Sequence, residues 1–513
     1  MVRLARFPLF FFVIFFCVVA AFVTSTSRIL TIIFILGICS FFVVPLIYKK
    51  FIKIKPLTCI SNLYFFVIAS SFLGPVISPQ IFFNFGGSFY LYRIVWVIFL
   101  FVSFFYIFYN PKLLEELIFK IKNLQVKKYL FFLIFWFFLQ IFVLIFSPDL
   151  SESTRLLFLF FCSIILTITM PIGISSTDKL KTFFYVYITI LVLSYIVGGL
   201  ELAGYRLPNS ALNYDKAIAT GKALKTVSKE TYMLLYGWGA TAFFGNQNNF
   251  SVYIIFSLPL VLSGITEFNF KFWGKYFLFN VLLIGVLFIF FLASRSCIVA
   301  LVIILILESI VLFTKRDIIK KIPNIFITVF VLIMANFLVF KTFVKERALH
   351  KLQTLLYLKS FFTNQEDSSF NVRLSILNNT SYIIKKNPLF LIWGSGFGSA
   401  EYYFNIYGLP FLSLHNWLLE VFLSSGIFIF VGNIIFYFYI MLNLFRVYFK
   451  TNDKMIRFFS KALFMSLITF CVTFITCSSV LAFIPYWALL GISLAVINIE
   501  RQNNLKKKEE CNV

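Results

Sequence analysis

The sequence predicts an all-α protein of a lipid bilayer, with about 12–14 transmembrane helices and a large loop that contains amphipathic helices. Apolar runs longer than the ~18 residues that suggest a spanning helix recur from one end of the chain to the other. Hydrophobic residues make up 61% of the 513 positions, whereas charged residues make up only 13%. The runs do not alternate in polarity as the strands of a membrane barrel do, so we expect helices.

The predicted spans follow one another along the whole chain. The first run, RFPLFFFVIFFCVVAAFVTS, has an apolar stretch longer than the ~7–15 residues of a signal-peptide core. No clear small-x-small cleavage site follows it, and further spans come at once, so we interpret it as the first membrane helix. The apolar runs are centred near residues 15, 38, 67, 101, 138, 165, 190, 257, 285, 305, 332, 436, 470 and 490.

The distribution of lysine and arginine predicts the orientation of these spans. Cytoplasmic loops retain basic residues, whereas short exported loops are depleted of them. With the N-terminus inside, alternate connections are rich in basic residues, as in 49–55, 112–128, 315–321 and 446–461, the last of which ends at Lys461. The short outer turns hold only Arg28, Arg93, Arg155 and Arg295. We therefore expect both termini in the cytoplasm, and the net charge of +25 indicates this bias and anionic lipid rather than a nucleic-acid partner.

This topology divides the chain into alternating membrane and loop segments. Both long loops on the outer face carry more basic than acidic residues, which predicts an anionic ligand there, although ordinary solvated loops are the alternative. The predicted segments are N-terminal transmembrane helices 1–201, an outer-face loop 202–248, transmembrane helices 249–341, a large outer-face loop 342–424, C-terminal transmembrane helices 425–498 and a cytoplasmic tail 499–513.

Cysteine and acidic residues give no sign of a disulfide framework or a metal site. Neither outer loop contains cysteine, and most of the 8 cysteines fall within apolar runs. The only adjacent acidic pair on the outer face is Glu366-Asp367, and no Asp-x-Asp occurs there. We therefore expect neither a bound metal nor another cofactor.

Three polar stretches have two interpretations each. GNQNNF, residues 245–250, places Asn246 and Asn248 at the mouth of a membrane helix, where they are candidate substrate-binding residues or part of a hydrated helix N-cap. GSGFG, residues 394–398, lacks the strand–helix context of a nucleotide loop, so a tight turn at the membrane surface is predicted. Glu308 lies inside a membrane helix, as a transport carboxylate or as a packed or snorkelling residue.

Two arginines and one histidine are the candidates for chemistry on the outer face. Arg295, in ASRSC, lies in a turn that the charge rule disfavours, and Arg373 lies early in an amphipathic stretch. His415 precedes NWLLEVFLSSG, whose apolar residues share one helical face, so the imidazole is expected near the start of a helix at the outer surface. An uncoupled surface histidine is the alternative. Asn416, next to it, is a further candidate for substrate binding.

Four sequence blocks resemble the superfamily of O-antigen ligases and Wzy-type O-antigen polymerases. HNWLLEVFLSSG resembles the His-Asn-x-x-Leu signature of that superfamily, with a glycine, Gly426, eleven positions after the histidine. GNQNNFSVYIIFSLPL, FLASRSCIVAL and NVRLSILNNTSYIIKKNPLFLIWGSGFG are similar to other blocks, in the same order. The resemblance covers about residues 240–430.

The resemblance implies a metal-free glycosyltransferase on the outer face of the bacterial cytoplasmic membrane. Such enzymes move a glycan from undecaprenyl pyrophosphate to an acceptor hydroxyl, without a nucleotide sugar. By motif position, Arg295 and Arg373 resemble the arginines that bind the pyrophosphate, and His415 resembles the residue that activates the acceptor. The local chemistry agrees, because pyrophosphate is a good leaving group that needs cations to hold its charge and one base for the hydroxyl.

Three functions stay open, and the first is preferred. The chain would polymerise lipid-linked repeats into an O-antigen, capsule or related wall glycan, or ligate a finished glycan to lipid A core or another wall acceptor. A flippase for the lipid-linked oligosaccharide is the alternative of another class, but the polar groups gather at the outer surface and no internal repeat is evident. The expected partners are the lipid-linked donor, the glycan acceptor and membrane lipid, with chain-length regulator and flippase proteins beside them.

Overall fold

The computed structural model describes residues 111–203, 239–268, 272–313, 368–409 and 414–511, apart from single positions at 245, 293, 415, 478 and 482, together with a few positions between 64 and 99. Every regular element among these residues is a helix, which confirms the predicted all-α class. The helices are α5 (Pro111–Lys122), α6 (Lys127–Leu144), α7 (Leu150–Gly173), α8 (Thr177–Leu202), α11 (Gln247–Glu267), α12 (Phe272–Leu292), α13 (Arg295–Phe313), α18 (Ser368–Lys386), α19 (Phe390–Trp393), α20 (Ser399–Ile406), α21 (Trp417–Lys450), α22 (Lys454–Thr473) and α23 (Ile484–Cys511).

Seven of the helices in the described ranges are long and apolar enough to cross a membrane, namely α6, α7, α8, α11, α12, α21 and α22. They coincide with the apolar runs centred near residues 138, 165, 190, 257, 285, 436 and 470, so the sequence located these spans correctly. The runs near residues 305 and 490 are also helical, as α13 and α23. The runs near 15, 38 and 332, and most of those near 67 and 101, lie outside the described residues.

The chain divides into two compact units. The first contains residues 1–123 and 178–250, and it holds α5 and nearly all of α8. The second contains residues 124–177 and 251–513, and it holds α6, α7, most of α11 and every later helix. The second unit carries Arg295, Arg373 and the His-Asn motif.

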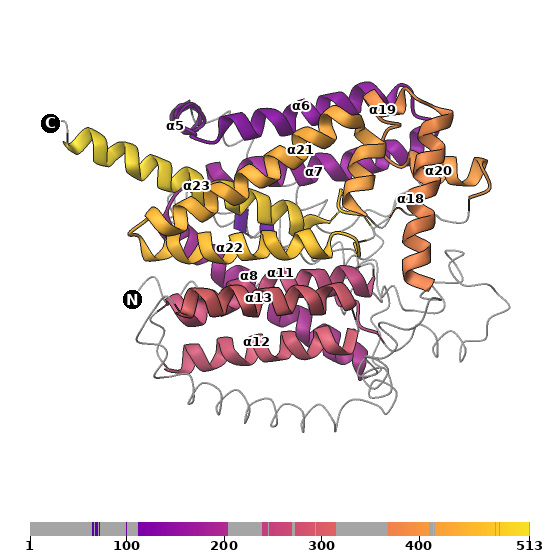
Figure 1. Cartoon of the computed structure of the whole chain (residues 1–513). Helices are drawn as coiled ribbons and strands as arrows, with labels where there is room; N and C mark the ends of the chain where they lie inside the picture. Colours follow the sequence, from indigo (N-terminus) through magenta and orange to yellow (C-terminus); the bar gives the residue numbers. More distant parts are fainter. Residues whose placement is uncertain are drawn as a thin grey trace, which may run out of the picture. The chain divides into compact units, whose positions relative to one another are not determined.

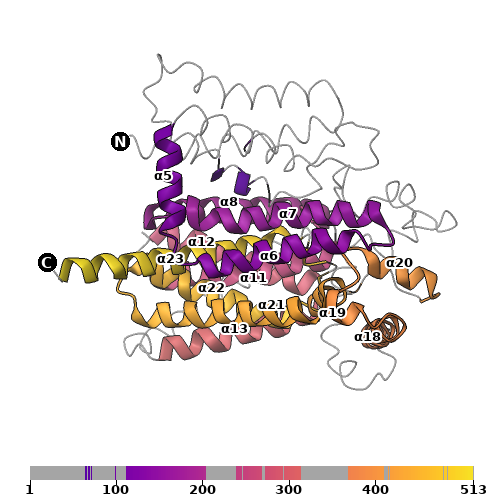
Figure 2. The ribbon, with the colours of Figure 1, turned by 90° about the horizontal axis from the view of Figure 1, so that it is seen from above.

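Small side chains let the helices of the second unit approach one another closely. In Figures 1 and 2, α7 and α23 lie side by side, and α21 packs beside α22 and α6. A Cβ atom at Gly491 in α23 would lie 2.7 Å from the sulfur of Met170 in α7, so a larger residue would require the Met170 side chain to shift. Nearby, the Thr167 hydroxyl donates a hydrogen bond of 3.0 Å to the Trp487 carbonyl oxygen. Such hydroxyl contacts and glycines are typical of helix packing in membranes.

Aromatic packing fixes the first turn of α21 in this unit. The indole ring of Trp417, the first residue of α21, lies 5.5 Å from the ring of Tyr437, 5.2 Å from Phe470 and 5.4 Å from Tyr486. These partners come from α21, α22 and α23, and Trp417 is buried. Aromatic pairs at such distances stabilise more than their buried area alone. The start of α21, directly after the His-Asn pair, therefore has a fixed place among three helices.

A buried ion pair joins α13 to α22. The Lys461 ammonium lies 2.6 Å from a carboxylate oxygen of Glu308, with 2% and 5% of the two side chains exposed, and 3.7 Å from Glu267. Glu308 is thus a packed residue that neutralises a lysine inside the unit. Lys461 was expected in a basic connection, but it lies in the second turn of α22 and faces its acidic partners. Pairing explains how a lysine remains in such an apolar place.

Candidate functional site

The predicted residues of the second unit lie at or near the start of three helices. Arg295 is the first residue of α13, Arg373 lies in the second turn of α18, and both are exposed. Asn416 caps α21, because its side-chain oxygen accepts a hydrogen bond of 3.2 Å from the Leu419 N–H. His415 lies outside the described residues, although Leu414 and Asn416 on either side are described. We name the end of the unit where α13 and α21 begin the motif end.

The connection between α22 and α23, residues 474–483, joins two of these helix starts. Next to Arg295, the Ser296 hydroxyl lies 3.2 Å from the Thr476 hydroxyl in a hydrogen bond. On the other side, the N–H of Trp417 donates to the Phe474 carbonyl oxygen at 3.4 Å. One short segment thus contacts both the helix that begins with Arg295 and the helix that begins directly after the His-Asn pair.

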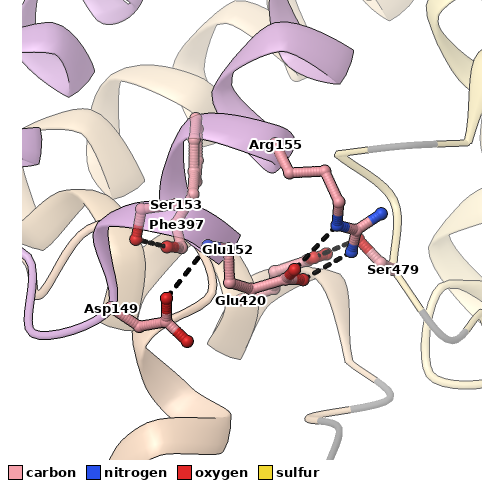
Figure 3. Close-up of polar contacts among 7 residues, drawn as sticks. All are labelled: Asp149, Glu152, Ser153, Arg155, Phe397, Glu420 and Ser479. Carbon is pink, nitrogen blue, oxygen red and sulfur yellow. Dashed lines mark hydrogen bonds and ion pairs between the residues drawn. The ribbon is translucent and has the colours of Figure 1, made fainter. Parts of the chain in front are cut away.

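Glu420 holds the same connection from the first turn of α21. Its carboxylate accepts hydrogen bonds from the Ser479 hydroxyl and, at 2.8 Å, from the Val480 N–H. Figure 3 shows this contact together with the pair formed by Arg155 and Glu152 at the start of α7. Glu420 is not among the site residues that the sequence predicts. The available signal was a single acidic residue in an otherwise apolar helix, which usually marks a specific partner.

The helix that carries Arg373 is attached to the start of α21 by a small apolar core. Ile376 follows Arg373 by one turn, and both Ile376 and Ile383 are buried on one face of α18. In Figures 1 and 2, α18 runs across the motif end, with α20 beside it. The core contains Ile376, Ile383, Phe404, Leu414 and Leu423. Since Leu414 directly precedes His415, the same core fixes the backbone next to the predicted base and the helix that presents Arg373.

The GSGFG stretch is a tight turn packed on α21, as its composition predicted. Gly394 and Gly426 have left-handed backbone φ angles of 79° and 75°. A Cβ atom added at Gly394 would lie 2.3 Å from the Ser424 carbonyl oxygen. One added at Gly426 would lie 2.1 Å from the Ile392 carbonyl oxygen. Only glycine permits both the left-handed φ and this backbone contact.

The turn supplies hydrogen-bond donors where α21 is kinked. Gly426 has non-helical backbone angles, so carbonyl groups before it lose their helical partners. The Ser395 N–H donates to the Leu423 carbonyl oxygen at 2.8 Å, and the Gly396 N–H donates to the Ser424 carbonyl oxygen at 3.1 Å. The kink and the turn therefore depend on each other, and the turn is a structural device rather than a nucleotide loop.

Acidic groups surround Arg155 beside this turn. Asp149 caps α7 by accepting from the Glu152 N–H at 3.0 Å, and Arg155 donates to the Glu152 carboxylate at 2.7 Å. Partial burial, followed by the Glu152 carboxylate, raises the pKa of Glu401, while Arg155 lowers it. Ser153 donates to the Phe397 carbonyl oxygen, as Figure 3 shows. Within the part of the chain that the structure describes, no three His, Cys, Asp or Glu residues gather so that they could hold a metal ion.

The two asparagines of GNQNNF belong to the first unit. The Asn246 side-chain oxygen accepts a hydrogen bond of 2.7 Å from the Asn249 N–H at the start of α11. This is the helix N-cap that the sequence offered as the alternative to a binding role. Asn248 is exposed in the first turn of α11.

Replacing Gly426 by alanine should destabilise the motif end far more than the same change at Gly408. Both glycines have positive φ angles, 75° and 62°, which cost a residue with a Cβ atom ~1–2 kcal/mol. A Cβ atom at Gly408 would meet nothing within 4 Å, whereas one at Gly426 would meet the Ile392 backbone. Thermal unfolding of both variants in lipid nanodiscs checks this expectation. Equal losses of stability would show that the contact with Ile392 contributes nothing.

The region that contains these residues is similar to known proteins. Residues 280–434 match the family model described as O-antigen ligase. Over 115 residues the chain is 26% identical to the teichuronic acid biosynthesis protein TuaE of Bacillus subtilis (strain 168), a match that covers 22% of this chain. The matched part is only 24% of the length of that relative. No solved structure matches the chain.

Proposed function

We propose that this chain, whose residues 280–434 match the O-antigen ligase family model, polymerises lipid-linked oligosaccharide repeats into a surface polysaccharide. The family match supports an enzyme of polysaccharide assembly, and the name of the TuaE relative refers to biosynthesis of teichuronic acid. The observation that carries the proposal is the shared contact of the α22–α23 connection with the start of α13 and the start of α21. It brings the helix of Arg295 and the helix of the His-Asn motif to one place.

The proposed reaction is one direct displacement at the anomeric carbon of the donor sugar. A hydroxyl oxygen of the acceptor glycan forms the new bond to this carbon, and the bond from the carbon to the pyrophosphate oxygen breaks. The electron pair of the broken bond stays on the pyrophosphate, and the hydroxyl proton passes to His415. Inversion at the anomeric carbon follows from a single displacement.

Arg295 and Arg373 have the chemistry to hold the pyrophosphate. A guanidinium group presents paired N–H donors that match two phosphate oxygens and remains charged at any physiological pH. Both side chains are exposed at the motif end, where a headgroup can reach them. Fixed cations that face the leaving oxygen stabilise the charge that develops there in the transition state. His415 then needs only to take the proton, a task for which imidazole is suited near neutral pH.

The proposal places the motif end on the outer face of a bacterial cytoplasmic membrane, with both termini in the cytoplasm. The segment 342–424 is then the outer loop that approaches the donor. Neighbouring proteins of the same assembly, such as a flippase and a chain-length regulator, would deliver the donor and limit the product. Ligation to lipid A core or another wall acceptor uses the same chemistry with a different acceptor.

A reconstituted assay tests the proposal. Purified protein in liposomes should convert pyrophosphate-lipid-linked repeats into a ladder of longer lipid-linked chains, and excess EDTA should leave the rate unchanged, because no metal takes part in the step. Transfer to added lipid A core without a ladder would show a ligase instead. Movement of the donor across the bilayer without new glycosidic bonds would show a flippase. Loss of turnover in EDTA with rescue by magnesium would contradict the metal-free mechanism.

A further inference from the structure

The short helix α19 and the residue before it expose apolar side chains at the motif end. Leu389 is 68% exposed, Leu391 44% and Trp393 49%. Single exposed leucines are ordinary on protein surfaces, but a cluster of apolar side chains indicates a binding surface. The charged residues that precede this cluster, Lys385 and Lys386, are exposed in the last turn of α18. The segment thus changes from charged to apolar within a few residues.

The residues that contact α19 show where it lies along the direction in which the helices would cross the membrane. The Trp393 ring lies 6.2 Å from the ring of Phe142, in the last turn of α6. Beyond Phe142, Ile145 and Phe146 are 75% and 68% exposed. These two residues directly follow α6, whose 18 residues span about 27 Å at 1.5 Å per residue, slightly less than the ~30 Å apolar core of a membrane. If α6 crosses that core from its first residue, the apolar layer extends to Ile145 and Phe146, past Trp393.

The length of α21 leads independently to the same position of α19 relative to the membrane. Its part after the kink, residues 427–450, is long enough at 1.5 Å per residue to cross the ~30 Å apolar core by itself. The Ile392 carbonyl group packs against Gly426, where that part begins. α19 therefore lies at the boundary of the apolar layer and not on a water-filled loop above it. Figures 1 and 2 both show α19 near the end of α6 and beside the kink of α21.

We propose that α19 is an anchor inserted among the lipid chains of the leaflet at the motif end. The exposed surface of Leu389, Leu391, Ile392 and Trp393 continues the exposed apolar side of α6, where Phe135 and Phe138 point outward. A partner protein would need a separate apolar surface, whereas lipid already covers the continuation of this one. Tryptophan is enriched at such boundaries, because its ring is apolar and its N–H is polar.

The anchor has a consequence for the proposed site. α19 leads directly into the turn that packs on the α21 kink, and α18 with Arg373 precedes it in the chain. Insertion of α19 into lipid therefore fixes how far α18, the helix of Arg373, lies from the membrane surface. A pyrophosphate attached to a lipid is found at that surface. The anchor itself does not depend on the proposed reaction.

Spin labels at single cysteines test the anchor in lipid nanodiscs without any substrate. The native cysteines are first replaced by serine or alanine. Leu391→Cys and Ile392→Cys then place a label in α19. Ser381→Cys on the exposed side of α18 and Phe135→Cys on α6 provide the two reference positions. Collisions with apolar oxygen and with a water-soluble nickel chelate are measured at each position. All four positions are at the surface, and gel filtration checks that each variant is folded.

We expect the ratio of oxygen to nickel collisions at positions 391 and 392 to approach that at position 135, and to exceed that at position 381 several-fold. Ratios at 391 and 392 equal to that at 381 would overturn the proposal, because α19 would then lie in water. Low collision rates with both reagents would also overturn it, because the surface would then be covered by protein. Each outcome is independent of whether the protein forms a polysaccharide.

Discussion

Replacing His415 by alanine should nearly abolish chain growth while leaving donor binding largely intact. Loss of a general base typically lowers a rate by about 100- to 10,000-fold, and the cations that hold the pyrophosphate remain in this variant. Arg373→Lys should act differently, since it keeps a positive charge but loses the paired hydrogen bonds to phosphate oxygens, so both donor binding and rate should fall. Polymer length and binding of the donor lipid are measured for each variant at equal expression in the membrane.

His350 provides the matched control for this experiment. It is the other histidine of the two in the chain and occurs in KERALHKLQ, without a matching motif. We expect His350→Ala to form polymer at the normal rate. Normal chain growth in His415→Ala would contradict the role of His415 as base, and failure of His350→Ala in its place would assign the role to the other histidine.

Replacing Lys461 by methionine should destabilise the second unit by ~3–5 kcal/mol, because the change leaves the Glu308 carboxylate buried without its partner. The double variant Lys461→Met with Glu308→Leu should recover most of this loss, since both charges of the close pair are then absent. Unfolding by heat or denaturant in nanodiscs measures the change.

The pair of Arg155 and Glu152 is the exposed counterpart of this ion pair. Their side chains are 48% and 30% exposed, so Arg155→Ala should cost no more than ~1 kcal/mol. A small loss in Lys461→Met, similar to that in Arg155→Ala, would show that the buried pair is not required for stability. A double variant less stable than Lys461→Met would show that Glu308 contributes without the lysine.

Hydropathy was sufficient to locate the seven candidate spans among the described residues, because the spacing of apolar residues is a local property of the chain. The runs near residues 138 and 436 became α6 and α21, and the glycines of GSGFG formed the expected tight turn. The N-cap at Asn246 could be predicted for the same reason, since a cap involves only the turn that follows it.

Contacts between segments that are distant in the sequence could not be predicted in this way. Nothing local in Glu420 indicates that it holds Ser479 and Val480, which follow about sixty positions later. Lys461 looked like a loop lysine, because its acidic partners come from two other helices. The kink at Gly426 is likewise joined to the turn after Gly394 by backbone hydrogen bonds from a segment about thirty positions earlier in the chain. Specific packing decides these features.

In the proposed reaction, the motif end transfers a glycan from a lipid pyrophosphate to a hydroxyl by one direct displacement. The most direct measurement is the amount of free lipid pyrophosphate released for each glycosidic bond formed by purified protein in liposomes. We expect one molecule to be released per bond in the wild type and in His350→Ala, and almost none in His415→Ala. Bond formation without release of lipid pyrophosphate, or release at the same rate in His415→Ala, would contradict the proposed reaction.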